Sequence, residues 1–351
     1  MKVLLIGPSN TLYMPYLDNY TRILKENSIE YSIIIWDRFG IENNEHNKII
    51  YRDKKLGHKR NLSDYYSFST FVKKEIKKIG AEKIIVFGLQ IFFFLHRLLD
   101  KFYKDRYMLD IRDYHRLINF IPRKIFSRIK NIVISSAGYK EWLPEDNLIL
   151  NHNSKIKMDE ITTNINVDFG IKPIKILCIG ALRDYEINEK IIHSLGNNKK
   201  YELIFRGEGT INNQLSDLII SNNYHNVILS GRYEQKEEKA FYIESSFINV
   251  LRSAKDINNN TALPNRLYQA VEKGIPLLAY KGTYLSKIIH NYKLGLVLYD
   301  LTTIDKQIEE YIRNFDILKY NENRKIFLAK TLDDNNLFKD TILNFSESKE
   351  Q

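Results

Sequence analysis

The chain has 351 residues and a formal net charge of +10, of which about +8 falls in the first 170 residues. Hydrophobic residues make up 44% and charged residues 27%, a balance that is typical of globular proteins and excludes a largely disordered chain. This length exceeds one comfortable hydrophobic core, so we expect two domains. The single cysteine, Cys178, lies in an apolar run and excludes an internal disulfide.

The apolar runs are too short for membrane insertion. The N-terminal run ends at Pro8, and the most apolar later stretch, residues 91–95, is followed at once by His96 and Arg97. A membrane-spanning helix needs about 20 apolar residues. We therefore expect no signal peptide and a cytoplasmic protein, with attachment to the inner face of the membrane as a further option.

Short apolar runs alternate with amphipathic stretches along the first half. The pattern predicts strands at 2–6, 31–36, 83–87, 107–111 and 131–135, and helices at 16–26, 68–79, 92–103 and 125–130. Strands that alternate with helices favour a parallel sheet covered on both faces.

Residues 151–172 are polar and lose this rhythm, so we interpret them as the passage between domains. The alternation then restarts, with strands predicted at 174–179, 201–205, 227–229, 247–251 and 277–280, and helices at 188–195, 212–222, 235–243, 265–273 and 304–314. We expect domains at 1–168 and 169–320. A helical tail at 321–351 is expected to pack back on the first domain.

Three ordered motifs mark the second half. Ile204-Phe-Arg-Gly-Glu-Gly209 follows a predicted strand, Val227–Tyr233 repeats the strand-then-glycine arrangement, and Ala262–Pro276 carries Pro-Asn-Arg, a helix and Gly-Ile-Pro. This set resembles the donor half of the family 4 glycosyltransferases, particularly bacterial capsule and surface-polysaccharide members. The resemblance implies an α/β protein of the GT-B type, with two Rossmann-like doubly wound parallel-sheet domains and an interdomain cleft. It also implies sugar transfer from a nucleotide-diphosphate donor, with UDP as the expected carrier.

The start of the predicted helix at 265–273 suits an anionic ligand. Pro264 presets the turn, the free backbone N–H groups at Asn265 favour a negative charge, and Arg266 adds a bidentate fork for phosphate. The other donor-binding candidates follow strands or belong to the motifs; they are Arg183, Arg206, Gly207, Gly209, Tyr233 and Gln269. The alternative for Arg183 is that it lies on the surface and forms an ion pair with Asp184 or Glu186. The alternative for Gly207 and Gly209 is that they form a plain turn.

The sequence departs from the family at two positions. Members commonly carry two glutamates eight positions apart, the second of which holds the donor ribose. Aligning the Gly274 and Pro276 block puts Thr261 at the first position and Gln269 at the second. The amide of Gln269 can still bond ribose hydroxyls, but Thr261 cannot do the work of a carboxylate.

Acceptor-side chemistry is predicted at the end of the strand at 107–111. Arg112 and Asp113 stand where the family commonly shows a His-Asp pair, and His115 follows two residues later. An acceptor hydroxyl must lose a proton, which a carboxylate or imidazole can take. The alternatives are an ion pair of Asp113 with Arg112 or Arg116 and a solvent-facing His115.

No cofactor and no metal site are expected, because the histidines lack ligand spacing. The predicted partners are a nucleotide-sugar donor, a glycan or polyprenyl-diphosphate-linked oligosaccharide acceptor and an anionic membrane surface, without nucleic acid. The membrane prediction depends on a basic group at Arg123, Lys124, Arg128 and Lys130, interleaved with apolar residues. Alternative functions are a catalytically diverged glycan- or nucleotide-binding protein and a GT-B nucleotide-sugar epimerase.

Overall fold

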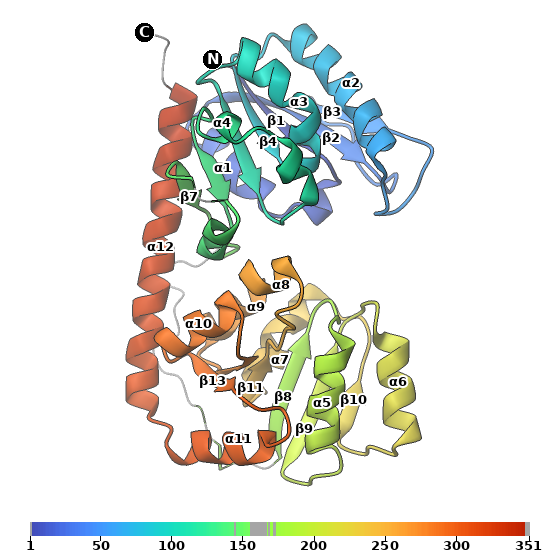
Figure 1. Ribbon diagram of the computed structural model, residues 1–351, viewed down its shortest axis with the longest axis vertical. Helices are drawn as coiled ribbons and strands as arrows, with labels where there is room; N and C mark the ends of the chain where they lie inside the picture. Colours follow the sequence, from blue (N-terminus) through green and yellow to red (C-terminus); the bar gives the residue numbers. More distant parts are fainter. Residues whose placement is uncertain (1, 144, 155–166, 168, 171–172, 348–351) are drawn as a thin grey trace. The chain divides into compact units, whose positions relative to one another are not determined.

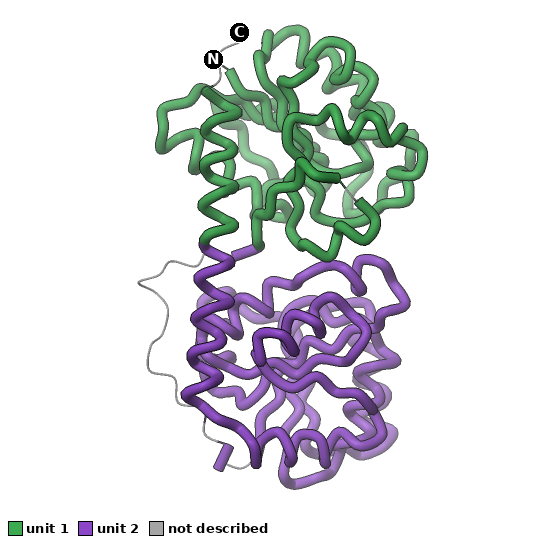
Figure 2. Tube along the Cα trace, turned by 60° about the vertical axis from the view of Figure 1, so that its left-hand side comes forward, with its two compact units in different colours: residues 1–152, 333–351 green, residues 153–332 purple. Residues whose placement is uncertain are grey.

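The computed structural model describes residues 2–143, 145–154, 167, 169–170 and 173–347. The chain folds into two compact units, which Figure 2 shows in different colours. Unit 1 comprises residues 1–152 with 333–351, and unit 2 comprises residues 153–332. The predicted boundary at residue 168, like most of the predicted passage at 151–172, lies outside the described residues.

Unit 1 is built on a seven-stranded parallel sheet with the order β3-β2-β1-β4-β5-β6-β7. The strands are β1 Lys2–Gly7, β2 Glu30–Asp37, β3 Lys48–Arg52, β4 Lys83–Phe87, β5 Tyr107–Ile111, β6 Ile132–Ile134 and β7 Leu148–Leu150. The helices are α1 Leu17–Glu26, α2 Leu62–Ile79, α3 Leu89–Phe102 and α4 Arg123–Phe126. Because β1, β4 and β5 are almost wholly buried, their sequences read as continuous apolar runs.

The helix predicted at 125–130 is shorter than expected. It forms α4 and ends in a turn, and the apolar residues interleaved with its basic side chains are buried in the core. Arg128 pairs with Asp100 at 3.1 Å. This segment therefore presents charge to solvent but no continuous apolar face; the exposed aromatic residue nearby is Phe120.

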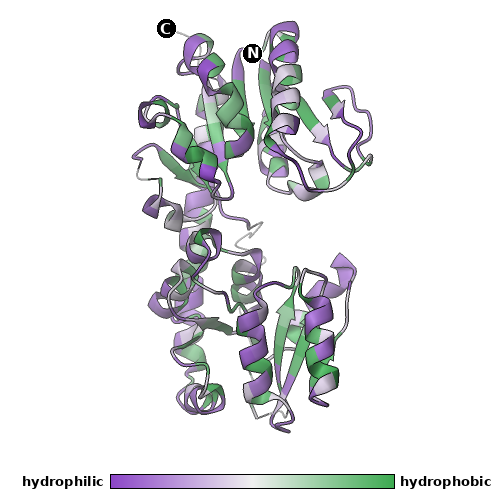
Figure 3. Cartoon of the chain, turned by 45° about the vertical axis from the view of Figure 1, so that its right-hand side comes forward, coloured by the Kyte–Doolittle hydropathy of each residue, from purple (hydrophilic) through white to green (hydrophobic). Residues whose placement is uncertain are grey.

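Unit 2 has a six-stranded parallel sheet with the order β10-β9-β8-β11-β12-β13. The strands are β8 Ile174–Ile179, β9 Tyr201–Arg206, β10 Val227–Leu229, β11 Phe247–Asn249, β12 Leu277–Tyr280 and β13 Gly295–Leu298. The helices are α5 Tyr185–Leu195, α6 Asn212–Ser221, α7 Glu238–Ile243, α8 Ile257–Thr261, α9 Asn265–Lys273, α10 Tyr284–Asn291 and α11 Ile304–Arg313. In both units the strands carry the hydrophobic colours of Figure 3, and the outer helix faces are hydrophilic.

The last helix, α12 (Ile317–Glu347), begins four residues before the predicted helical tail at 321–351. Its sequence contains neither Pro nor Gly, so nothing in the backbone interrupts it. Phe327 and Leu328 belong to the core of unit 2, whereas Phe338 and Ile342 belong to the core of unit 1. The chain thus returns to its first unit through one continuous helix (Figure 1).

Among the described residues, no helix combines the length and the apolar character that crossing a membrane requires.

Candidate functional site

The loops that follow β8, β9 and β10 are joined to one another by backbone hydrogen bonds. The Gly180 N–H donates to the Arg206 carbonyl at 2.9 Å, and the Gly207 N–H donates to the Gly231 carbonyl at 2.7 Å. In open α/β sheets, ligands bind beyond these carboxyl ends of the strands. These backbone hydrogen bonds therefore hold the three loops in fixed positions at the carboxyl ends of the strands, where a ligand is expected.

Gly207 and Gly209 allow these loops to approach each other closely. A Cβ on Gly207, whose φ is +129°, would lie 2.0 Å from the Gly180 carbonyl oxygen, and one on Gly209 would lie 1.8 Å from that of Leu182. The Gly209 N–H also donates to the Asn212 side chain at 2.7 Å. In this structure the two glycines thus serve contacts between loops, and the Gly209 amide already has a partner.

Arg206 ends β9, and one of its polar atoms has no partner in the described part of the chain. Its guanidinium lies 4.3 Å from the centroid of the Phe241 ring, which Tyr233 meets edge-on at 5.9 Å. The Arg206 Nε is buried and has no hydrogen-bond partner among the described residues. Leaving a buried charged donor unpaired costs free energy that a bound acceptor would recover. Arg206 is therefore suited to an anionic ligand.

Arg266 lies in the first turn of α9, next to the ends of β8 and β11. Its Nη1 donates to the Asn249 carbonyl at 3.3 Å and lies 3.5 Å from the Cys178 Sγ. Burial raises the pKa of Cys178, so this cysteine stays a neutral thiol and is no nucleophile. These contacts hold the guanidinium at the ends of β8 and β11, and Arg266 belongs to the helix start for which Pro264 is the N-cap residue.

Glu238, in the first turn of α7, joins this site although the sequence did not single it out. Burial and then the interaction with Glu238 raise the pKa of Tyr233 to about 12. The same two causes raise the pKa of Tyr242, whose hydroxyl donates to Gln269 Oε1 at 2.8 Å. One carboxylate, two phenols and one amide thus form a cluster. In the sequence, Glu238 looks like any acid in the first turn of a helix.

Thr261 and Arg183 have different surroundings. The Thr261 side chain is 0% exposed, and its Oγ1 donates to the Ile257 carbonyl at 2.7 Å, so it packs within α8. Arg183 is exposed on the loop after β8. Of its two alternative ion-pair partners, Glu186 is instead bonded to Lys255 at 2.8 Å, and Asp184 accepts from Asn259 at 2.8 Å.

In unit 1, Arg112 is held by its own surroundings. Nε and Nη2 donate to the two oxygens of the buried Asp110, each at 2.6 Å, and Nη1 and Nη2 donate to Asn151 at 3.0 and 2.7 Å. Burial lowers the pKa of Arg112, but the charge and hydrogen bonds of Asp110, together with Tyr20 and Tyr16, outweigh it and the net shift is upward. The guanidinium therefore connects the end of β5 to the segment after β7.

The two neighbouring candidates differ in their surroundings. Asp113 is exposed. The His115 Nδ1 accepts a hydrogen bond from the Leu117 N–H at 3.3 Å and so caps a short 3₁₀ turn. Burial and the charge of Arg116 lower the pKa of His115. The imidazole is thus neutral near pH 7, with its proton on Nε2.

A buried polar network at the ends of β1 and β2 was also missed from the sequence. Asn10 donates to Asp37 at 2.7 Å, and Arg52 donates to the same carboxylate at 3.0 Å. Burial opposes ionisation of Asp37, but these bonds and two backbone N–H groups lower its pKa to about 2. Asn and Asp are common in turns, so only the tertiary contacts distinguish this pair.

Over the described ranges, no three His, Cys, Asp or Glu side chains gather in a way that would hold a metal ion.

Comparison with known proteins gives matches among solved structures alone. No protein-family description and no curated protein matches the sequence. Sucrose-phosphate synthase from Thermosynechococcus elongatus has a TM-score of 0.70 at 11% identity, over 97% of this chain and 98% of that one. HepE from Anabaena, solved with UDP and glucose, has a TM-score of 0.66 at 10% identity, over 97% and 99%. The pneumococcal O-GlcNAc transferase GtfA, solved with UDP and GlcNAc, has a TM-score of 0.65 at 9% identity, over 99% of this chain and 99% of that one.

The chain has the GT-B fold. These matches span nearly the whole chain, and both parallel sheets of the structure agree with the predicted pair of Rossmann-like domains. At such low identity the likeness establishes the fold and nothing finer. Membership of family 4 and a role in capsule synthesis stay predictions.

Within this GT-B fold, every predicted donor-binding residue belongs to unit 2, and the predicted acceptor-side residues belong to unit 1. The structure brings Arg206 and Tyr233 together around Phe241, and it brings Gln269 to Tyr242. It leaves Arg183 on the surface and uses the Arg112 guanidinium internally.

Proposed function

We propose that this protein is a glycosyltransferase that takes a sugar from a nucleoside-diphosphate donor, with UDP as the carrier. The observation that carries the proposal is the unpartnered, buried Nε of Arg206 at the carboxyl end of β9, in the same unit as the helix-start amides of α9 and Arg266. Solved proteins similar in fold to this chain include two in complex with UDP and a sugar.

The proposed chemistry is charge neutralisation of the leaving group. The bond between the sugar anomeric carbon and the donor phosphate breaks as a bond to the acceptor oxygen forms. Negative charge then develops on the nucleoside diphosphate, which preorganised guanidinium groups and N–H dipoles stabilise. Arg206 and Arg266 would supply this charge, with Arg183 as a third cation on an exposed loop.

Family 4 members commonly carry a glutamate for the donor ribose, and this chain has Gln269 at that position. Glu238 offers a carboxylate near it. Tyr242 links the two, because its hydroxyl donates to Gln269 while the charge of Glu238 acts on its pKa. Vicinal ribose hydroxyls are donors that a carboxylate binds more strongly than an amide does. We therefore assign donor ribose recognition to Glu238 together with Gln269.

The acceptor hydroxyl loses its proton during transfer. Asp113 is exposed and His115 is neutral, so each can accept a proton or position the hydroxyl. In a retaining reaction the donor phosphate can take the proton instead. The acceptor we propose is a growing bacterial surface glycan. Binding of anionic lipid by the basic group that begins at Arg123 and Lys124 would support a lipid-linked acceptor.

The test is calorimetric titration of the full chain with UDP, GDP and ADP, followed by UDP release from a panel of UDP-sugars with and without a lipid-linked acceptor. We expect UDP to bind, and Arg206→Gln to weaken it about tenfold, the loss expected for one charge-assisted hydrogen bond. Lys236→Gln, an exposed lysine paired with Glu234, is the matched control. Failure of every nucleoside diphosphate to bind would overturn the proposal.

A second candidate is a diverged protein that binds nucleotide-sugars without transfer. The buried, internally bonded Thr261 favours it, because no carboxylate stands at that position. UDP binding without UDP release from any UDP-sugar would decide for this candidate.

A further inference from the structure

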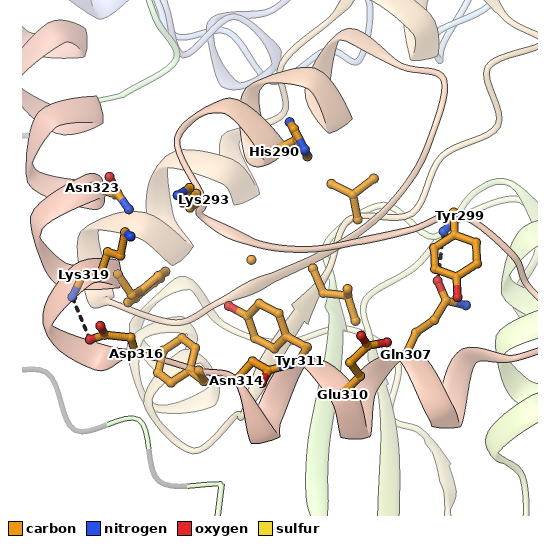
Figure 4. Close-up of a pocket in the computed structure, with 15 residues that line it drawn as sticks. His290, Lys293, Tyr299, Gln307, Glu310, Tyr311, Asn314, Asp316, Lys319 and Asn323 are labelled. Carbon is orange, nitrogen blue, oxygen red and sulfur yellow. Dashed lines mark hydrogen bonds between the residues drawn. The ribbon is translucent and has the colours of Figure 1, made fainter.

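Unit 2 contains a cavity of about 580 Å³ that shares no residue with the candidate donor site. It runs along the edge strand β13, opens to solvent, and is bounded by α11 and the first turns of α12, with the end of α10 on another side (Figure 4). Pockets of about 300–1,000 Å³ hold small organic ligands. The volume is therefore sufficient for a sugar-sized molecule.

One wall of the cavity is an unpaired strand edge. Leu277 and Lys281 donate to the carbonyls of Leu294 and Leu298, each at 3.0 Å, so these carbonyls face β12. Because successive residues of a strand turn their backbone groups to opposite sides, those of Gly295 and Val297 point away from the sheet. The Tyr299 N–H, next in this outward series, donates to Gln307 Oε1 at 3.0 Å. The remaining outward N–H groups are available to a ligand.

Two side chains from α12 add buried donors without partners. Tyr320 is 3% exposed, and its hydroxyl has no hydrogen-bond partner among the described residues; the same is true of the Asn323 Nδ2. Both residues line the cavity. Buried polar groups are nearly always satisfied in native proteins, so two orphans at one cavity indicate a missing acceptor.

The two ends of the cavity differ in charge. Lys293 precedes β13, and Lys319 lies one helical turn before Asn323, so both ammonium groups belong to the end where β13 begins. Figure 4 shows Lys319 and Asn323 on the same side of α12. Glu310, on α11, lies toward the end where Gln307 contacts Tyr299. Asp316 also lines the first end, where its carboxylate accepts from the Lys319 backbone N–H at 3.0 Å. Two lysines, one carboxylate and the Asn323 amide thus gather at one end, and Glu310 lies toward the other.

Aromatic rings form the floor between these ends. Tyr311 and Phe315 have ring centroids 5.6 Å apart, and Phe315 and Tyr320 are 5.4 Å apart. Rings of this kind pack against the apolar C–H face of a pyranose, whereas its hydroxyls need both donors and acceptors.

We propose that this cavity is a second binding site, for a pyranose that carries an anionic substituent, either a carboxylate or a phosphate. The anionic group lies between Lys293, Lys319 and the Asn323 amide. The sugar ring lies on the aromatic floor, with hydroxyls bonded to Tyr320 and Glu310. Binding here does not depend on the proposed transfer reaction, because no residue is shared with the donor site.

The test is calorimetric titration of the full chain with glucuronate, glucose 6-phosphate, glucose and inorganic phosphate. We expect one of the two anionic sugars to bind, and the better one identifies the substituent. Tyr320→Phe removes only the orphan hydroxyl and is expected to weaken binding about tenfold without loss of thermal stability. Asn323→Leu and Lys319→Gln should weaken it to a similar extent, and the exposed Lys325→Gln, also on α12, should not.

Several results would overturn the proposal. One is the failure of both anionic sugars to bind in the millimolar range, and another is glucose or phosphate alone binding as well as the better of them. If the Tyr320→Phe variant gains stability and binds the sugar with full affinity, the Tyr320 hydroxyl is buried but does not contact the ligand. Loss of binding in Arg206→Gln, with the cavity variants unaffected, would place the sugar at the donor site. The UDP titration reports on the donor site separately, so failure of either proposal leaves the other standing.

Discussion

Replacing Gly209 with alanine tests whether the joined loops at the end of the unit 2 sheet set the position of the donor site. The new Cβ would lie 1.8 Å from the Leu182 carbonyl oxygen, against about 3.4 Å for ordinary contact. Backbone therefore has to move by well over an ångström, and overpacking of this kind costs about 1–3 kcal/mol. Losing the Gly209 N–H bond to Asn212 adds about 1 kcal/mol. The expected loss of stability is about 3 kcal/mol.

For a domain of this size, that loss corresponds to a melting temperature about 6–12 °C lower. Because Leu182 directly precedes Arg183, the same displacement moves a proposed phosphate ligand, and we expect weaker UDP binding as well. The control is Gly231→Ala, at φ +66° with no atom within 4 Å of the new Cβ, which costs about 1 kcal/mol of backbone strain alone. Differential scanning calorimetry and UDP titration measure both effects. A Gly209→Ala protein that melts like the Gly231→Ala control and binds UDP normally would refute the reasoning.

Three further predictions concern single carboxylates and their partners. Glu238→Gln should weaken UDP binding about 3–10-fold by calorimetry at an unchanged melting temperature, since it replaces a charged acceptor by a neutral one; unchanged affinity would remove Glu238 from the donor site. Arg112→Met should cost about 3–5 kcal/mol in urea unfolding, because it leaves the buried Asp110 carboxylate without its cation; a small cost would contradict the contacts described. Asp37→Asn should cost about 2 kcal/mol at pH 7 and progressively less below pH 4. The folded pKa of Asp37, about 2, lies below the ordinary 3.8, so its contribution is complete above the ordinary value and is lost as the pH falls through the folded one. A cost that does not change between pH 7 and pH 2 would argue against this linkage.

The central strands and the long helices were predictable from sequence. β4, β5, β8 and β12 coincide with the predicted ranges, because a strand buried on both faces must be apolar at every position. The strands β3, β7 and β13 were not predicted. They lie at the sheet edges and are only partly buried. The strands β7 and β13 are apolar but have only 3 and 4 residues, and β3 begins and ends with a basic residue, so the sequence signal is weak.

The site was predicted in part. Arg206 and Arg266 follow strand and helix-start patterns that sequence reveals. Glu238 begins α7, four residues before Tyr242, but the link from Tyr242 to Gln269 spans 27 positions and forms only in the folded unit. No local pattern distinguishes such an acid from one that faces solvent. The same limit applies to Arg112, whose guanidinium donates to Asn151, 39 positions away.

The amino-acid sequence by itself determined the alternation of strands and helices and the glycine and arginine motifs at the ends of strands, because burial period and turn chemistry are local properties. Only the tertiary structure decided which polar groups find partners. Arg112 is satisfied within unit 1, whereas the Arg206 Nε and the Tyr320 hydroxyl remain without partners in the described part of the chain. Whether a buried donor is satisfied depends on residues distant in sequence, and those unsatisfied donors are the atoms on which both proposed sites depend.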